Sequence, residues 1–178
     1  ATRVIFLGGL GEIGRNMIAI EASGEILVID AGLSFPNDEM LGVDLVLPDF
    51  SYVAERAESC VGVVLTHGHE DHVGALSWFL KDVDVPVYGT PLTLGMAAKR
   101  LNESGQEAEM NEITAPGTMT IGSFRCHFLP VSHSIPDAIS VAIDTTDGRV
   151  LYTGDFKLDE APIDGRLTDV EGFRRLGA

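Results

Sequence analysis

The sequence predicts a mixed α/β fold in one globular unit, and three observations support this. Segments with the length and hydrophobic pattern of β-strands outnumber segments with a helical pattern. In the first third of the chain, strands follow one another through short turns instead of alternating with helices, which excludes a simple βαβ order. With 178 residues, of which 45% are hydrophobic, the chain can bury a single substantial core.

Eight segments are expected to be strands because they alternate or run apolar over strand-like lengths. They are Val4–Leu7, Asn16–Glu21, Ile26–Asp30, Val61–Leu65, Val85–Tyr88, Phe124–Val131, Ile139–Asp144 and Val150–Thr153. A hairpin turn over Ala22–Glu25 is expected to join the second segment to the third.

Four segments are expected to be helical, namely Ser51–Ser59, Gly74–Lys81, Pro91–Glu103 and Asp169–Leu176. The third carries the clearest boundary signals. Thr90 is its expected N-cap, Pro91 stands in its first turn, and Gly105 lies just past its end.

Composition restricts the setting and the partners. The formal net charge of −15 argues against a broad nucleic-acid-binding face on these residues. Cys60 and Cys126 are isolated and form no CxxC pair, so a reducing, cytoplasmic setting fits best. The apolar run Val4–Leu7 is too short for a signal sequence or a membrane span, so we expect a soluble protein without a membrane partner.

The stretch His67-Gly-His-Glu-Asp-His72 carries the strongest chemical signal. Three of the five histidines and a carboxylate lie within it, directly after an apolar strand pattern and before a helical one. Consecutive side chains diverge on such a turn, so some can bind one metal ion and others its neighbour. Zinc takes imidazole and carboxylate ligands, and two ions about 3.5–4 Å apart can hold both oxygens of a phosphoryl displacement. The motif therefore predicts a metallohydrolase.

A glycine-rich stretch, Gly9-Leu-Gly-Glu-Ile-Gly14, matches the dinucleotide-binding pattern G-x-G-x-x-G, and Asp30 lies at a suitable distance from it. That pattern requires a helix to start within the glycines. Asn16–Glu21 alternates like a strand instead, so we reject the dinucleotide-binding interpretation. We expect a loop whose backbone passes near the site.

Further polar residues follow strands elsewhere in the chain. Asp30 ends one apolar strand, His133 and Asp155 follow two others, and Asp137 lies in the loop after His133. Each one alone has an ordinary explanation as a turn or loop residue. Ligands of an α/β site collect at the carboxyl ends of strands, so we expect these residues to join His67–His72 in one site.

Asp30, the H-x-H-x-D-H motif, His133 and Asp155 resemble, in order, the first four motifs of the metallo-β-lactamase superfamily. Longer strings resemble the ribonuclease J family of β-CASP nucleases: Gly8-Gly-Leu-Gly-Glu-Ile-Gly-Arg-Asn16, His67–Gly74, His133-Ser-Ile-Pro-Asp137 and Thr153-Gly-Asp-Phe-Lys157. The resemblance covers essentially the whole chain. It implies a metallo-β-lactamase αββα sandwich that is incomplete, with residues 1–178 forming the N-terminal part of the domain.

Carried over residue by residue, the resemblance implies two Zn²⁺ ions. The first takes His67, His69 and His133, the second takes Asp71 and His72, and Asp155 bridges the two. Asp30 is not a ligand in this scheme but braces the loops that carry the ligands. Mn²⁺ or Fe²⁺ stays an alternative, because affinity order and metal availability decide which ion is loaded.

Relatives of this kind continue with a β-CASP domain and the returning half of the lactamase domain, which brings a further histidine. We therefore expect an N-terminal portion of a longer, homo-oligomeric protein, with one complete metal site and a second site short of a ligand. An isolated portion can be inactive. His127 matches no metal motif and is expected to be a packed or edge-strand histidine. Lys157 and Arg166 can approach a phosphate backbone, although solvated surface charges are the default for both.

The implied function is zinc-dependent hydrolysis of RNA phosphodiester bonds in RNA processing and decay, by 5′–3′ exonuclease or endonuclease cleavage. Asp71 or Asp155 is the expected proton acceptor for the attacking water. Two alternatives stay open: a thioester or lactam hydrolase on the same fold, and an inactive metal-bound module for RNA binding or assembly. Every motif keeps its ligand-type residue, which argues against the second. His69 stands where di-iron relatives carry a carboxylate, which disfavours a redox role.

Overall fold

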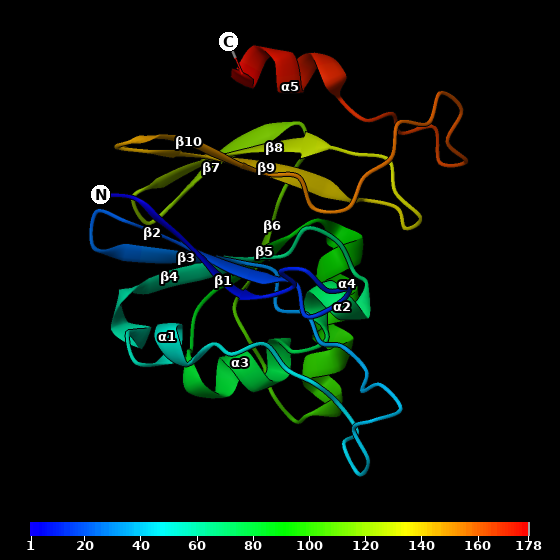
Figure 1. Cartoon of the computed structure of the whole chain (residues 1–178). Helices are drawn as coiled ribbons and strands as arrows, with labels where there is room; N and C mark the ends of the chain where they lie inside the picture. The colour runs from blue at the N-terminus through cyan, green and yellow to red at the C-terminus, as the bar shows by residue number, and fades with distance from the viewer. Residues whose placement is uncertain (178) are drawn as a thin grey trace.

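Two β-sheets lie face to face between outer helices in the computed structural model, which describes residues 1–177 (Figure 1). The layers run from helices α1, α3 and α4, through a six-stranded sheet and a four-stranded sheet, to helix α5 (Val170–Gly177). This arrangement confirms the αββα sandwich expected from the sequence motifs.

The six-stranded sheet has the order β1-β2-β3-β4-β5-β6. Its strands are β1 (Arg3–Gly8), β2 (Met17–Ala22), β3 (Glu25–Ile29), β4 (Cys60–Val64), β5 (Val87–Gly89) and β6 (Met110–Glu112). The first three strands pair antiparallel and the last four pair parallel. Within β3, Ile26 and Val28 pack toward the helices, whereas Leu27 and Ile29 pack toward the other sheet. Burial on both faces explains why this strand is apolar without interruption.

Helices cover the outer face of this sheet. They are α1 (Ser51–Ala54), the 3₁₀ turn η1 (Ala57–Ser59), α2 (Glu70–Val73), α3 (Leu76–Asp82) and α4 (Pro91–Glu103). Leu76 and Phe79 of α3, with Leu94 and Leu101 of α4, are buried in the core beneath them. Apolar residues three and four positions apart form one face of a helix, which these helices turn to the sheet.

The four-stranded sheet is antiparallel, with the order β10-β9-β8-β7. Its strands are β7 (Gly117–Ile121), β8 (Phe124–Pro130), β9 (Ile139–Thr145) and β10 (Gly148–Tyr152). Phe124, Cys126 and Phe128 of β8 point into the core between the sheets, and the intervening Arg125 and His127 point away from it. Helix α5 lies over this outer face (Figure 1).

Several predicted elements need correction. The single helix expected over Ser51–Ser59 is wrong, because the segment forms the short α1 and a separate 3₁₀ turn. The sequence patterns missed β6 and β7, and they missed α2 inside the histidine motif, which was expected to be a turn. The rejection of a dinucleotide-binding fold is confirmed, because β1 leads through the glycine loop into an antiparallel β2 rather than into a helix.

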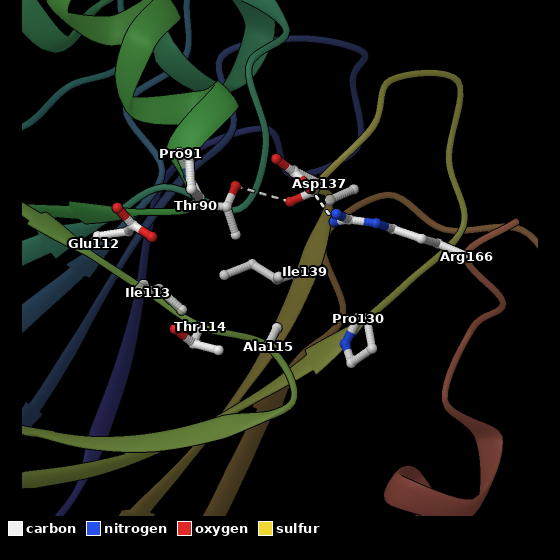
Figure 2. A pocket seen from close by; sticks show the side chains of 11 residues that line it. Thr90, Pro91, Glu112, Ile113, Thr114, Ala115, Pro130, Asp137, Ile139 and Arg166 are labelled. Carbon is white, nitrogen blue, oxygen red and sulfur yellow. Dashed lines mark hydrogen bonds and ion pairs between the residues drawn. The ribbon is translucent and has the colours of Figure 1, made fainter. Parts of the chain in front are cut away.

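Helix α4 begins where predicted, and Thr90 is its N-cap as expected. Thr90 stands at the N-cap position with an extended backbone, yet its side chain makes no hydrogen bond to the first turn's backbone. Its hydroxyl donates to the carbonyl of Asp137 at 2.9 Å (Figure 2). The same hydroxyl lies 3.0 Å from the Thr93 hydroxyl. The threonine therefore ties α4 to the loop after β8.

No helix within residues 1–177 has both the length and the apolar character needed to cross a bilayer.

Candidate metal centre

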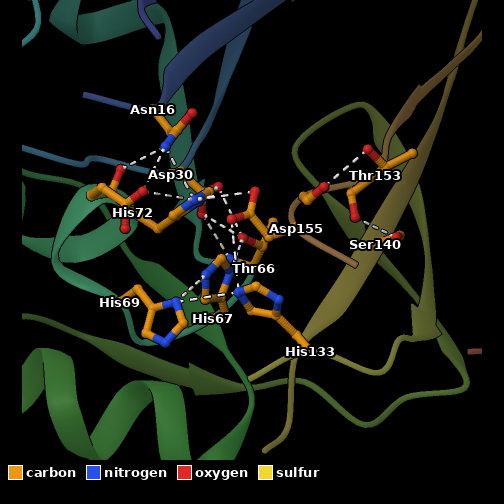
Figure 3. A network of polar contacts seen from close by, with 12 residues as sticks. Asn16, Asp30, Thr66, His67, His69, His72, His133, Ser140, Thr153 and Asp155 are labelled. Atoms are coloured by element: carbon orange, nitrogen blue, oxygen red, sulfur yellow. Dashed lines mark hydrogen bonds and ion pairs between the residues drawn. The ribbon is translucent and has the colours of Figure 1, made fainter. Parts of the chain in front are cut away.

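Segments from both sheets bring the predicted ligands together at one end of the sandwich (Figure 3). The loop after β4 carries His67 and His69, and the following helix α2 carries Asp71 and His72. His133 follows β8 and Asp155 follows β10, so these two come from the other sheet. The structure thus unites residues that lie as far apart in the sequence as 67 and 155.

Three imidazoles form the first cluster. Nδ1 of His69 lies 3.1 Å from Nε2 of His67 and 3.3 Å from Nε2 of His133. One ring nitrogen offers either a single N–H or a single lone pair, so it can make only one of these contacts as a good hydrogen bond. Convergence of three such nitrogens within 4.8 Å of one another suits a metal ion that accepts all three lone pairs.

A second cluster joins His67 and His72 to Asp155, again with ligand atoms within 4.8 Å of one another. Nε2 of His72 lies 3.6 Å from Oδ1 of Asp155 and 3.7 Å from Oδ2 of Asp71. The other oxygen of Asp155, Oδ2, lies 3.7 Å from Nε2 of His133. The Asp155 carboxylate therefore faces one cluster with each oxygen, as a bridging ligand would.

Asp30 lies beneath the clusters and is fully buried. Its Oδ1 accepts a hydrogen bond from the backbone N–H of Thr66 at 2.8 Å, and its Oδ2 lies 2.7 Å from Nδ1 of His72. The Thr66 hydroxyl contacts both carboxylate oxygens and also Nδ1 of His67 at 3.1 Å. With Nδ1 of both histidines engaged, Nε2 is the atom left to bind a metal. The backbone of Asp30 has the left-handed conformation, with φ 60°.

Burial and neighbouring charges set the protonation of the centre. Burial and the three neighbouring imidazoles lower the pKa of His67 to about 2. Burial also opposes a charge on His72, but the Asp30 carboxylate and a contact with Asp155 raise the pKa of His72 to about 10. The same contact with His72 lowers the pKa of Asp155 to about 2. At neutral pH, His67 is therefore already in the neutral form that binds metal, whereas His72 must first lose a proton.

The backbone of α2 is held by the segment that follows β3 and by Asn16, just before β2. The carbonyls of Glu70, Asp71 and His72 accept hydrogen bonds from the backbone N–H groups of Leu33, Asn16 and Ala31, at 2.8–3.1 Å. Close approach of the two segments requires Gly32, because a Cβ there would stand 1.6 Å from the Asp71 carbonyl oxygen. The short helix is thus fixed by distant residues.

Three supporting residues were not singled out from the sequence. Thr66 organises Asp30 and His67, as described above. The Asn16 amide nitrogen lies 3.1 Å from the Asp71 carbonyl oxygen and 3.1 Å from Nε2 of His72, so the end of the glycine loop does pass near the site. Tyr152 at the end of β10 is packed near Asp30, and burial together with that carboxylate raises the pKa of its phenol. In the sequence, the signal for these three residues is their position next to the predicted ligand motifs.

Two residues lie apart from the centre. The expectation that Asp137 joins the site is wrong, because it pairs with Arg166 beside a separate cavity (Figure 2). His127 lies on the outer face of the four-stranded sheet, with Nε2 2.8 Å from Oδ2 of Asp144. It is a partly buried histidine, as expected, and contacts none of the predicted ligands.

The arrangement suits hydrolysis of a substrate that approaches from solvent. Buried His67, His72 and Asp30 form the floor, while the side chains of Asp71 and Asp155 are 34% and 47% exposed. A substrate can reach these two carboxylates from solvent, and they and the histidines are the residues that would hold bound ions. The donor set of imidazoles and carboxylates fits a divalent metal.

Comparisons with known proteins agree with this geometry. A family model described as the metallo-beta-lactamase superfamily matches residues 10–175. Ribonuclease J of Mycobacterium tuberculosis (strain ATCC 25618 / H37Rv) is 44% identical over 98% of this chain and 32% of its own length. Ribonuclease J2 of Bacillus subtilis (strain 168) is 41% identical over 98% of this chain and 32% of its own length. These similarities confirm the resemblance found in the motifs, and the chain spans about a third of the length of these relatives.

Solved structures share the fold at lower identity. A protein of unknown function from Enterococcus faecalis V583 superposes with a TM-score of 0.67 at 22% identity, covering 88% of this chain and 44% of that one. The short form of human tRNase Z superposes with a TM-score of 0.62 at 14% identity, covering 97% of this chain and 73% of that one. At such identities the likeness concerns the fold alone.

Proposed function

Because this chain belongs to the metallo-β-lactamase superfamily, we propose that it forms the metal-binding part of a zinc-dependent ribonuclease that hydrolyses RNA phosphodiester bonds. The names of the curated relatives support the choice of RNA as substrate. One structural observation carries the hydrolytic part of the proposal. The Asp155 carboxylate faces His72 with one oxygen and His133 with the other, which is the placement needed to join two adjacent metal sites.

The proposed ligand set is the one implied by the motifs. His67, His69 and His133 would hold the first Zn²⁺, Asp71 and His72 the second, and Asp155 both. Oδ2 of Asp71 lies 3.7 Å from Nε2 of His72, which supports placing both at the second site. The additional histidine and the β-CASP domain of such relatives remain predictions for residues outside this chain.

The chain's own residues would divide the chemistry among them. When bound, the two ions would supply Lewis acidity and a water of lowered pKa. Asp155 is ionised at neutral pH, because its contact with His72 lowers its pKa to about 2, and an ionised carboxylate suits a metal ligand. Asp155 or Asp71, the two carboxylates on the exposed side of the centre, would accept the proton that the attacking water releases. Asp30 and Thr66 hold His72 and His67 in the orientation that keeps Nε2 directed at the site.

The cytoplasmic location and the homo-oligomeric state expected from the sequence are also proposals. The location is supported by two buried cysteines that form no disulfide, Cys60 and Cys126.

A direct assay of the intact, zinc-loaded protein tests the function. We expect hydrolysis of 5′-monophosphorylated RNA and no turnover of a glutathione thioester or a lactam. Labels at either end of the RNA would separate exonuclease from endonuclease cleavage. Turnover of the thioester or the lactam alone would replace the ribonuclease proposal by the alternative hydrolase. Zinc-dependent RNA binding without turnover of any substrate would favour the inactive module.

A further inference from the structure

A groove lies beside the metal centre, between the loop after β8 and the loop after β10. One wall is formed by His133–Pro136, and the other by Lys157, Asp159 and Ala161–Asp164, around a space of about 290 Å³. His133 is also a proposed metal ligand, so the groove adjoins the centre. Its volume is close to the ~300 Å³ at which small-ligand sites begin.

The backbone of Lys157 is fixed beside this wall. Its N–H donates to the carbonyl of Ser132 at 2.8 Å, in an isolated β-bridge, and its carbonyl accepts from the Thr168 hydroxyl at 2.8 Å. The Thr168 hydroxyl in turn accepts from the backbone N–H of Ser132 at 2.9 Å. These contacts place Lys157 next to the His133 loop without using its side chain, so a substitution there keeps them.

The Lys157 ammonium is available for an anion. Its side chain is 50% exposed, and Nζ contacts Oδ2 of Asp159 at 2.8 Å. Within residues 1–177 this is the one ion pair that Lys157 makes. Exposed lysine–aspartate pairs are weak and screened by salt, so a phosphate can displace the carboxylate.

Arg166, the other cation considered near the site, is engaged elsewhere. Its guanidinium donates to Asp137, and the pair lines a different cavity together with Thr90 and Ile139 (Figure 2). Among residues 1–177, those that line the groove next to the metal centre include one lysine, Lys157, and no arginine.

The remaining lining is mixed. Ile135, Pro136, Pro162 and Ile163 are apolar, and Ile163 is fully exposed, whereas Ser134, Asp159 and Asp164 are polar. Exposed apolar side chains beside a cation suit a ligand that has a flat, weakly polar body and a negative end. A nucleotide within a single strand has this composition.

We propose that this groove binds one nucleotide of the RNA strand adjacent to the cleaved bond, with Lys157 contacting its phosphate and the isoleucine and proline side chains contacting its ribose or base. The inference rests on the proposed function and names a residue that positions the strand. It also explains how an acidic chain of net charge −15 can hold a polyanion, because attraction is concentrated at the metal centre and at Lys157.

Binding, measured without turnover, tests the inference. The probe is a short single-stranded RNA with 2′-O-methyl and phosphorothioate groups, titrated against the intact zinc-loaded protein at several salt concentrations. Lys157→Ala and Lys157→Gln should each raise the Kd about three- to tenfold and reduce the slope of log K against log salt by about 0.7, the loss of one phosphate contact. Lys81→Ala, which removes an exposed lysine of α3, is the charge-matched control and should change neither quantity.

A second variant tests the role of the ion pair. Asp159→Asn frees the Lys157 ammonium and should tighten RNA binding severalfold, but this gain should largely disappear in the Lys157→Ala background. Equal gains in both backgrounds, or Lys157 variants that bind like Lys81→Ala, would overturn the inference. Failure of the wild-type protein to cleave unmodified RNA would instead overturn the proposed function, since the binding titration does not depend on cleavage.

Discussion

Oδ2 of Asp30 lies 2.7 Å from Nδ1 of His72, and neither side chain is exposed beyond 1%. This contact turns Nε2 of His72 toward Asp155 and makes His72 the most basic imidazole for which a shift is resolved. A carboxylate behind a metal-binding histidine fixes both the orientation and the basicity of the ring.

Asp30→Asn should therefore weaken metal binding while leaving most of the fold in place. The amide keeps the shape of the side chain but loses the charge that raises the pKa of His72. We expect zinc affinity to fall about 10- to 100-fold, as measured by competition with a chelator. Asp144→Asn is the matched control, because Asp144 makes a similar contact with His127 outside the centre. If Asp30→Asn bound zinc with wild-type affinity, the contact between Asp30 and His72 would not be needed for metal binding.

Removal of a shared imidazole should have a larger effect. His67 belongs to both candidate clusters, so His67→Ala should abolish RNA hydrolysis and reduce the bound zinc measured by elemental analysis. His127→Ala should retain the full zinc content, because His127 contacts Asp144 and Thr118 instead. An active, fully loaded His67→Ala protein would refute the ligand assignment.

Gly32→Ala should displace α2. The added methyl would stand 1.6 Å from the Asp71 carbonyl oxygen, a backbone atom that cannot move independently of the metal-binding helix. We expect a loss of unfolding free energy of about 3 kcal/mol, together with weaker zinc binding. Gly95→Ala in α4, where no atom lies within 4 Å, should instead stabilise the protein by about 0.5–1 kcal/mol. Chemical denaturation of both variants would measure the difference, and an unperturbed Gly32→Ala would contradict the close approach.

Zinc affinity should depend on pH differently at the two clusters. A raised pKa of about 10 keeps His72 protonated at neutral pH, so metal binding there must displace a proton and should strengthen up to tenfold per pH unit as the pH rises toward 10. His67, with a pKa near 2, contributes no such dependence above neutral pH. Titration calorimetry in buffers of different ionisation enthalpy counts the released protons. Affinities independent of pH would contradict the raised pKa.

The same shift predicts how stability of the metal-free protein depends on pH. A histidine with a pKa raised above 6.5 by folding stabilises the protein fully below that pH, and this contribution is lost as the pH rises through about 10. In Asp30→Asn the loss should move to lower pH. Thermal melting at a series of pH values would detect it, and identical profiles for both proteins would contradict the role of Asp30.

The sequence predicted the parts of the fold that local patterns encode. Pro91–Glu103 was predicted with its observed bounds, because a proline at its start and a glycine beyond its end mark it. By contrast, β6 has three residues, none of them buried, and exists because Met110 and its neighbours pair with β5. Helix α2 depends on hydrogen bonds from Asn16, Ala31 and Leu33. Such long-range pairing leaves no periodic signal in a short segment.

The candidate site was predictable to a similar degree. Each ligand-type residue that the motifs identified lies at the centre, because the motifs carry chemistry that ordinary turns do not need. Asp137 was misplaced, since only the fold shows that Arg166 stands near enough to pair with it. Thr66 and Asn16 were overlooked because their side chains act through hydrogen bonds whose partners are set by tertiary packing.

The proposed ligands are divided between the two sheets, with His67, His69, Asp71 and His72 from one and His133 and Asp155 from the other. Neither sheet can assemble the site before it has docked on its neighbour. A bound ion would then link the two sheets, and the metal content would report whether the sheets have docked.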